Sequence, residues 1–275
     1  MMFHENGPDR PDIAWKKAEP AEGDLLLYIR GGRVCLRDDG DTVALPRVGE
    51  DGAAPGETVY LFSVSGRGLF LAAGGTAPRG LTEIAPRELR YRKPMHIAFA
   101  ATLGWRLAEW YAASAYCGRC GAKNEPSGTE RAMVCPACGN TVYPAIAPSV
   151  IVLIRNGEKA LLTRYQAAHS AYRRYALVAG YTESGETPEE TVHREVAEEV
   201  GLRVRNVTYY KSQPWPLSGA LLLGFVCDVD GDDAVRVDPD ELECAEWIDR
   251  SDMPDRSEDV SLTSEMMEQF RLGRL

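Results

Sequence analysis

The stretch that decides the fold runs from Gly180 to Leu202 and reads Gly-Tyr-Thr-Glu-Ser-Gly-Glu-Thr-Pro-Glu-Glu-Thr-Val-His-Arg-Glu-Val-Ala-Glu-Glu-Val-Gly-Leu. Thr187 is a favourable N-cap residue, and Pro188 suits the first helical position. Glu190, three residues after Thr187, completes a capping box. Gly201 suits the left-handed residue just past a helix end. The stretch therefore predicts a helix that begins at Pro188 and ends before Gly201.

The predicted helix carries a stripe of valines and a cluster of glutamates. The valines recur every four residues and are expected to be buried; they are Val192, Val196 and Val200. Glu195, Glu198 and Glu199 stand at positions i, i+3 and i+4, so their carboxylates project from one patch and repel each other. A hard cation such as Mg²⁺ or Mn²⁺ would offset this repulsion. The alternative is a solvated acidic face.

The spacing of the whole stretch resembles the Nudix box and argues against the solvated face. The matching residues are Gly180, Glu186, Arg194, Glu195, Glu198, Glu199 and Gly201. The resemblance implies a loop–helix–loop whose glutamates bind the metal ions that assist diphosphate hydrolysis. By motif, Glu195 and Glu199 would be metal ligands, and Glu198 would be a further ligand or the base. Arg194 would pair with Glu186 and brace the loop.

Four of the seven cysteines form two C-x₂-C pairs separated by fourteen residues: Cys117 and Cys120, then Cys135 and Cys138. Doubled pairs at this spacing predict a closed four-thiolate Zn²⁺ site. Paired disulfides or a redox dithiol are the competing interpretations. Cys35, Cys227 and Cys244 lie in or near apolar runs and are interpreted as small buried hydrophobic residues.

Length and charge limit the classes of protein that fit. At 275 residues the chain can hold two or three small domains. A net charge of −10 argues against nucleic-acid binding over the whole surface, and it implies that a polyphosphate ligand needs metal ions or local basic residues. No apolar run is long enough to span a membrane and the start lacks a secretory signal, so we expect a cytoplasmic protein without membrane contact.

The pattern along the chain predicts three regions. Residues 1–114 would form a β-rich N-terminal domain with a loose start to about residue 20 and a connecting helix within 86–114. Residues 115–143 would form a zinc ribbon that is too short to bury its own core. Residues 144–275 would form a mixed sheet with a helix on either side. Its expected strands cover 149–154, 160–164, 175–179, 207–212, 220–229 and 246–248, with a closing helix over 259–273.

Three features in this order resemble the bacterial NADH pyrophosphatase family. They are the cysteine pairs, the linker Tyr143-Pro144-Ala145-Ile146-Ala147-Pro148, and Ser212-Gln213-Pro214-Trp215-Pro216 after the box. The resemblance implies an α+β fold, namely a Nudix α/β/α sandwich preceded by a zinc ribbon and a small β-rich domain. It also implies a homodimer with structural Zn²⁺ and catalytic Mg²⁺ or Mn²⁺. Such enzymes cleave NAD(H) to AMP and nicotinamide mononucleotide and remove NAD caps from RNA.

The same resemblance supplies candidate substrate residues. Tyr143 and Tyr181 match aromatic positions that hold the adenine, although either ring alone could equally be a core or interface residue. The other positions that match substrate-contacting residues are Glu130, Ala179, Gln213, Pro214 and Trp215.

Two departures from the family pattern leave alternatives open. Leu217-Ser218-Gly219-Ala220 replaces a Phe-Pro-x-Ser segment, and Cys244 stands where the pattern has a glutamate. A thiol is a poor ligand for Mg²⁺, so Glu246 or Glu241 would substitute, or the site would have one carboxylate fewer. The departures favour two alternative functions. One is a Nudix hydrolase of another nucleoside diphosphate derivative such as ADP-ribose, and the other is a nucleotide-binding sensor with little turnover.

Overall fold

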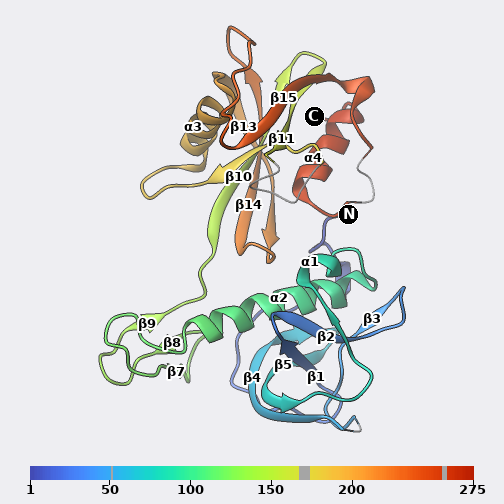
Figure 1. Ribbon diagram of the computed structural model, residues 1–275, viewed down its shortest axis with the longest axis vertical. Coiled ribbons are helices and arrows are strands. Elements are labelled where there is room, and N and C mark those ends of the chain that lie inside the picture. Colours follow the sequence, from blue (N-terminus) through green and yellow to red (C-terminus); the bar gives the residue numbers. More distant parts are fainter. Residues whose placement is uncertain (51, 167–173, 256–258) are drawn as a thin grey trace. The chain divides into compact units, whose positions relative to one another are not determined.

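The computed structural model describes the whole chain except residues 51, 167–173 and 256–258 (Figure 1). The chain divides into two compact units. The C-terminal unit contains Met1–Met2, Ile146–Trp215 and Ala220–Leu275, and the N-terminal unit contains Phe3–Ala145 and Pro216–Gly219.

A six-stranded mixed sheet forms the centre of the C-terminal unit. Its strands are β10 (Ala147–Asn156), β11 (Lys159–Tyr165), β12 (Val178–Tyr181), β13 (Val204–Trp215), β14 (Ala220–Val229) and β15 (Leu242–Asp249). The order is β13-β14-β10-β11-β15, and β12 also pairs with β10. The central pair β10 and β14 is parallel, whereas the other pairs are antiparallel. The expected mixed sheet is therefore confirmed.

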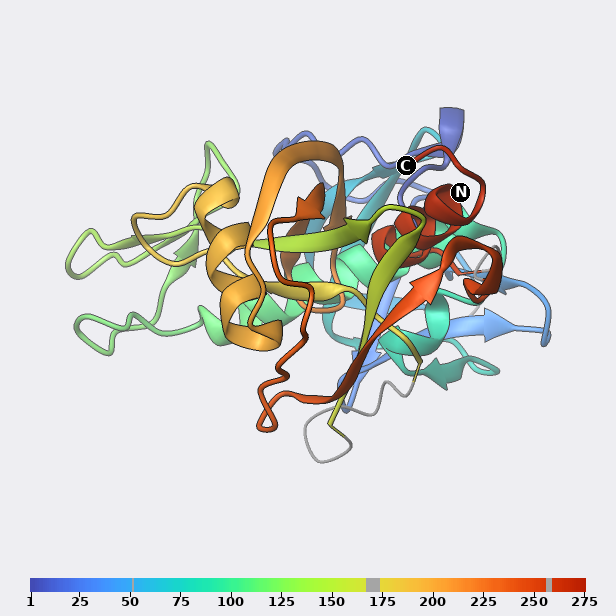
Figure 2. The same cartoon turned by 90° about the horizontal axis from the view of Figure 1, so that it is seen from above.

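Two helices cover opposite faces of this sheet, as Figures 1 and 2 show for α3 (Pro188–Val200) and α4 (Leu262–Arg271). Side chains alternate along β10 because successive residues of a strand point to opposite faces. Val150, Val152 and Ile154 pack with the valines of α3, and we refer to this cluster as the α3-side core. Ile151 and Leu153 pack with Leu262, Met266 and Phe270 of α4 in the α4-side core. The predicted sandwich is present.

The ends of α3 follow from its sequence. The Thr187 hydroxyl accepts a hydrogen bond from the Glu190 amide at 3.2 Å, and the Glu190 carboxylate accepts one from the Thr187 amide at 2.7 Å. Gly201 ends the helix with a φ of 69°, a left-handed conformation that costs glycine little. The predicted capping box and C-terminal glycine are both confirmed.

The N-terminal unit combines two small sheets with a long helix. The larger sheet contains β1 (Leu25–Arg30), β2 (Arg33–Asp38), β3 (Val43–Ala44), β4 (Ala54–Val64), β5 (Arg67–Thr76) and β6 (Thr82–Ile84). The helices are α1 (Pro86–Leu89) and α2 (Met95–Ala113). A three-stranded sheet follows, made of β7 (Glu125–Pro126), β8 (Met133–Val134) and β9 (Thr141–Val142). The predicted β-rich character of this region is confirmed.

Two details of the N-terminal unit differ from expectation. The start of the chain is not loose at Phe3, whose ring is fully buried and packs edge-to-face on Phe99 at 5.3 Å. The region 86–114 holds two helices, because Pro94 disfavours a helical conformation at the residue before it and thus separates α1 from α2.

Among the described residues, no helix has the length and apolar character that crossing a membrane requires.

Candidate functional site

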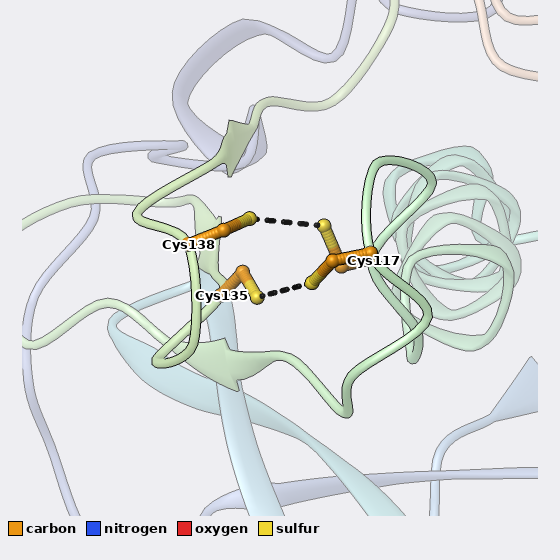
Figure 3. Close-up of side chains that lie close together, drawn as sticks. Cys117, Cys135 and Cys138 are labelled. Carbon is orange, nitrogen blue, oxygen red and sulfur yellow. Dashed lines mark hydrogen bonds between the residues drawn. The ribbon is translucent and has the colours of Figure 1, made fainter.

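The four cysteines of the ribbon converge on one point. The Sγ atoms of Cys117 and Cys138 lie 3.7 Å apart, and those of Cys120 and Cys135 lie 3.5 Å apart. Figure 3 shows Cys135 and Cys138 facing the knuckle that carries Cys117. Four sulfurs at the Zn–S distance in a tetrahedron would be about 3.8 Å apart. The thiols therefore fit Zn²⁺.

Local backbone geometry favours the thiolate form of Cys117. The Arg119 amide donates to the Cys117 sulfur at 3.4 Å and, with the Cys120 amide, lowers the pKa of the Cys117 thiol to about 6. Thiolates are the form that binds metal. In the part of the chain that the structure describes, no other group of three or more His, Cys, Asp or Glu converges this closely.

The glutamates of α3 differ in burial. Glu195 is 9% exposed and Glu199 only 2% exposed, whereas the Glu198 side chain is 59% exposed. Buried carboxylates are costly unless they are paired or bind a metal ion. The two buried carboxylates therefore need partners more than Glu198 does.

Arg194 braces the carboxylates from one side. Its guanidinium donates to both oxygens of Glu186, at 2.6 and 2.9 Å, and this contact lowers the pKa of Glu186 to about 2. The same guanidinium donates to Glu195 at 2.7 Å and to Glu198 at 3.0 Å. It also donates to the Tyr181 carbonyl at 2.9 Å. One arginine thus ties the loop before α3 to the acidic face of the helix.

Gly180 makes room for Glu195. A Cβ atom at position 180 would lie 1.9 Å from the Glu195 carboxyl carbon, so the carboxylate occupies the space that a larger residue would need. Gly180 belongs to β12, which packs directly on α3. The sequence marks this glycine as part of the box, but only the structure shows that it accommodates a carboxylate.

Glu199 carries an unused buried oxygen. The Ala179 amide donates to its Oε1 at 3.4 Å, while its Oε2 has no hydrogen-bond partner. Burial, followed by the charge of Glu195, raises the pKa of Glu199 to about 8. Burial likewise raises the pKa of Glu195. An orphaned carboxylate oxygen beside a second carboxylate fits a hard divalent cation.

The substrate residues expected in the C-terminal unit lie in different surroundings. The Tyr181 ring is 51% exposed next to α3, whereas the partly buried Ala179 and Trp215 pack against the α4-side core. Gln213 is fully buried and its amide is engaged: Nε2 donates to the Val260 carbonyl, and Oε1 accepts from the Leu262 amide. A direct contact between this side chain and a substrate would require those bonds to break. Pro214 is partly buried in β13.

Tyr143 and Glu130 belong to the N-terminal unit. The Tyr143 hydroxyl donates to the Glu130 carboxylate at 3.1 Å, and the Tyr143 ring is 55% exposed. The structure thus joins these two candidates, which the sequence placed in separate segments.

Cys244 and Glu246 lie on the α4 face of β15. Cys244 pairs with Arg164 and Glu246 pairs with Leu162, a residue of the α4-side core. The Glu246 carboxylate accepts a hydrogen bond from the Tyr175 hydroxyl at 2.8 Å. No local pattern predicted the contact with Tyr175, because it depends on how β15 and the segment before β12 assemble.

A mixed sheet between two helices, with an arginine-braced acidic pair buried on one of them, is the arrangement of a Nudix-type hydrolase. Comparisons with family models agree. The NUDIX domain model matches residues 145–270, and the NADH pyrophosphatase zinc ribbon domain model matches residues 112–143.

The chain belongs to the Nudix hydrolase family, with the zinc ribbon of NADH pyrophosphatases. It is 37% identical over 251 residues to the NAD-capped RNA hydrolase NudC of Deinococcus radiodurans, covering 86% of this chain and 83% of that protein. It is 44% identical over 153 residues to the protein of the same description from Escherichia coli K12, covering 55% of this chain and 58% of that protein.

Among solved structures, a NUDIX hydrolase from Nitrosomonas europaea is similar at a TM-score of 0.48 and 21% identity. The match covers 58% of this chain and 93% of that one.

Proposed function

We propose that this protein hydrolyses the diphosphate of NAD(H) to AMP and nicotinamide mononucleotide, and that it removes NAD caps from RNA. The observation that carries the proposal is the buried pair Glu195 and Glu199 on α3, with one carboxylate oxygen left unpartnered. The substrate class follows the similarity to proteins described as NAD-capped RNA hydrolases.

The α3 carboxylates would hold Mg²⁺ or Mn²⁺. A bound divalent ion would offset the negative charge of the diphosphate and lower the pKa of the attacking water. Glu195 and Glu199 are the proposed ligands, and Arg194 keeps Glu195 in place through the 2.7 Å hydrogen bond. Glu198, which is exposed, is proposed as a further ligand or as the base that takes the proton from water.

The reaction is substitution at phosphorus. The water oxygen forms a bond to one phosphorus while the bond from that phosphorus to the bridging oxygen breaks. The bridging oxygen leaves with the other phosphate, so the products are two monophosphates.

The proposed adenine contacts are Tyr143 and Tyr181, whose exposed rings can stack on a base. Ala179, Glu130, Gln213, Pro214 and Trp215 are proposed as further substrate-binding or supporting residues. We also propose the division 1–114, 115–143 and 144–275 as functional regions, a homodimer, and a cytoplasmic location. A reducing compartment would keep the four ribbon thiols available for Zn²⁺.

The testing experiment is product analysis with NADH, NAD⁺ and ADP-ribose, each with Mg²⁺ or Mn²⁺. The expected products from NADH are AMP and nicotinamide mononucleotide, and Glu199→Gln should abolish them. Glu189→Gln, an exposed acid on the same helix, is the matched control and should remain active.

Two other outcomes would support a different function. Cleavage of ADP-ribose alone would support a hydrolase of another nucleoside diphosphate derivative, which the altered Leu217–Ala220 segment favours. Binding without turnover would support a sensor, which Cys244 favours. Full activity of Glu199→Gln would contradict the proposed role of the acidic helix.

A further inference from the structure

The turn between β13 and β14 is fixed by a side chain from α2. The Nε atom of Arg106 donates to the Pro216 carbonyl at 2.8 Å, and its Nη2 atom donates to the Leu217 carbonyl at 3.0 Å. Arg106 lies 110 positions before Pro216 in the sequence, yet both belong to the N-terminal unit, which includes Pro216–Gly219. The conformation of this turn therefore depends on a distant residue.

The contact requires an arginine and is favoured by a glycine. A guanidinium presents its N–H groups as a rigid planar fork, so one edge can donate to two successive carbonyls, which a lysine cannot do with the same geometry. Gly219 has a φ of 78°, which residues with a Cβ atom rarely adopt. A Cβ atom at Gly219 would lie 3.5 Å from Nε and Cζ of Arg106, so the guanidinium also packs against the turn.

In the described part of the chain, no acidic side chain pairs with Arg106. Its polar and ring contacts there are the two turn carbonyls and the neighbouring Trp105 ring, whose centroid lies 5.1 Å from Cζ. Replacing Arg106 would therefore remove hydrogen bonds to the turn without leaving a carboxylate unpaired.

The turn continues directly from residues that are proposed to bind substrate. Trp215 pairs with Ala220 in the last pair of β13 and β14, so residues 216–219 join the two partners. Ser218 is exposed in this turn. Because the chain is continuous, a change in the turn alters the end of the strand pair that carries Trp215.

The proposed contacts divide a dinucleotide into two halves. In the proposed function, the exposed rings of Tyr143 and Tyr181 contact the adenine. Pro214 and Trp215 are then left for the other half, which in NAD(H) carries the nicotinamide ring. ADP-ribose has the adenine and the diphosphate but lacks this ring. A comparison of NADH with ADP-ribose therefore isolates the part of the substrate assigned to the segment beside the turn.

We propose that Arg106 is a positioning residue for the β13–β14 turn, and that it favours substrates with a nicotinamide half over substrates without one. The inference rests on the proposed function, because it assumes that Pro214 and Trp215 contact the substrate. Arg106 acts through the backbone of the turn and does not itself touch the substrate.

Steady-state kinetics and hydrogen exchange of the zinc-loaded full chain test this. Arg106→Met should raise KM for NADH by about tenfold with little change in kcat, as expected when binding common to the ground and transition states is lost. KM for ADP-ribose, or its inhibition constant against NADH where it is not cleaved, should stay near that of the unaltered protein. Hydrogen exchange over residues 214–221 should be faster in this variant, because the turn has lost two hydrogen bonds.

Two further variants serve as controls. Arg106→Lys keeps the charge but not the fork, and should recover only part of the loss. Arg67→Met removes another arginine of the same unit that donates to a backbone carbonyl, that of Gly23 at 2.8 Å. It should leave KM for both ligands and exchange over residues 214–221 unchanged.

Three outcomes would overturn the proposal. One is a KM for NADH that does not depend on Arg106. Another is an equal loss toward NADH and ADP-ribose, because the effect would then be general and not a preference. The third is an equal effect of Arg67→Met.

Failure of the proposed function can be recognised separately. If the unaltered protein does not cleave NADH, the proposed hydrolysis is wrong, and exchange with and without NADH decides the role of Arg106. Slower exchange over residues 214–221 on adding NADH, seen in the unaltered protein but not in Arg106→Met, would support that role. No effect of NADH on this segment would overturn it.

Discussion

The two sites suited to metal ions in this chain are built in opposite ways. In the ribbon, four thiols lie within 4.8 Å of one another, in a segment whose strands have only two residues each. On α3, the carboxylates instead share an arginine, because one nitrogen of Arg194 donates to both Glu195 and Glu198. The helix carrying them has its own caps and its own buried valines.

The difference fits the two roles that we propose for the metal ions. A segment with so little core depends on its metal for folding free energy, so the ribbon site is structural. A capped, packed helix folds without a metal and can therefore present carboxylates in an unfavourable, reactive arrangement. In the proposed function, stability and chemistry thus depend on different metal ligands within one chain.

The largest expected effect is on the ribbon. Cys135→Ser should abolish stoichiometric zinc and unfold residues 112–143, because structural Zn²⁺ contributes roughly 10–16 kcal/mol of binding free energy in small zinc domains. Metal analysis and hydrogen exchange would measure this. Cys244→Ser, outside the cluster, should keep its zinc. If the ribbon stayed folded in zinc-free Cys135→Ser, the ribbon would not depend on its metal for folding, and the contrast with α3 would be lost.

The next effect concerns the space that Gly180 leaves. Gly180→Ala should push the Glu195 carboxylate away and lower kcat/KM by about 100-fold, since misplacement by about 1 Å can have that effect. The helix content should persist, because the caps of α3 are untouched. Gly128→Ala, where a Cβ atom meets nothing within 4 Å, should be as active as the unaltered protein. Comparable loss in both variants would refute this packing argument.

The pH dependence of stability tests the cost of burying Glu199. Its pKa is about 8 in the folded, metal-free site against 4.5 ordinarily. As the pH rises, Glu199 loses its proton at a lower pH in the unfolded chain than in the folded one. The folded state is therefore fully stabilised by this group below about pH 4.5, and the stabilisation is lost as the pH rises toward 8. The free energy of unfolding should fall by on the order of a few kcal/mol across this window. Urea titrations of zinc-loaded protein without Mg²⁺ or Mn²⁺ would show it, and Glu199→Gln should flatten the slope. An unchanged slope in Glu199→Gln would mean that other groups cause the pH dependence of the free energy of unfolding.

The smallest effect tests whether α3 is stabilised by its own ends. Thr187→Ala should reduce the free energy of unfolding of the C-terminal unit by about 1 kcal/mol, the usual value of an N-cap hydroxyl. Thr187→Ser keeps the hydroxyl and should recover most of the loss. Chemical denaturation of both variants measures this, and equal losses would show that the cap does not stabilise the helix.

Local signals in the sequence predicted the parts of the site that lie within one element. Thr187, Glu190 and Gly201 set the ends of α3 because caps act within a few residues. The doubled cysteine spacing predicted the ribbon in the same way. The family resemblance named Arg194 and Glu186 as a pair, and the structure contains their ion pair.

What the sequence could not predict depends on contacts between distant segments. Burial of Gln213 arises where β13 meets the start of α4, and no local pattern reports it. An irregular register between Arg164 and Tyr165 places Leu242 in the α3-side core, although Cys244, two residues further on, lies on the α4 face of β15. Phe3 is buried against Phe99, a contact between distant segments. The polar residues near Phe3 in the sequence therefore led to the wrong prediction of a loose start.

The parallel pairing of β10 with β14 has a consequence for biosynthesis. Ala147 pairs with Ala220 and Arg155 pairs with Asp228, so the middle of the sheet closes only after a long intervening segment has been synthesised. Non-local parallel pairing of this kind slows folding. On the ribosome the ribbon and the β-rich sheet before it can fold early, while β10 waits with one edge unpaired. We therefore expect the C-terminal unit to be the part of the nascent chain that stays exposed to aggregation longest.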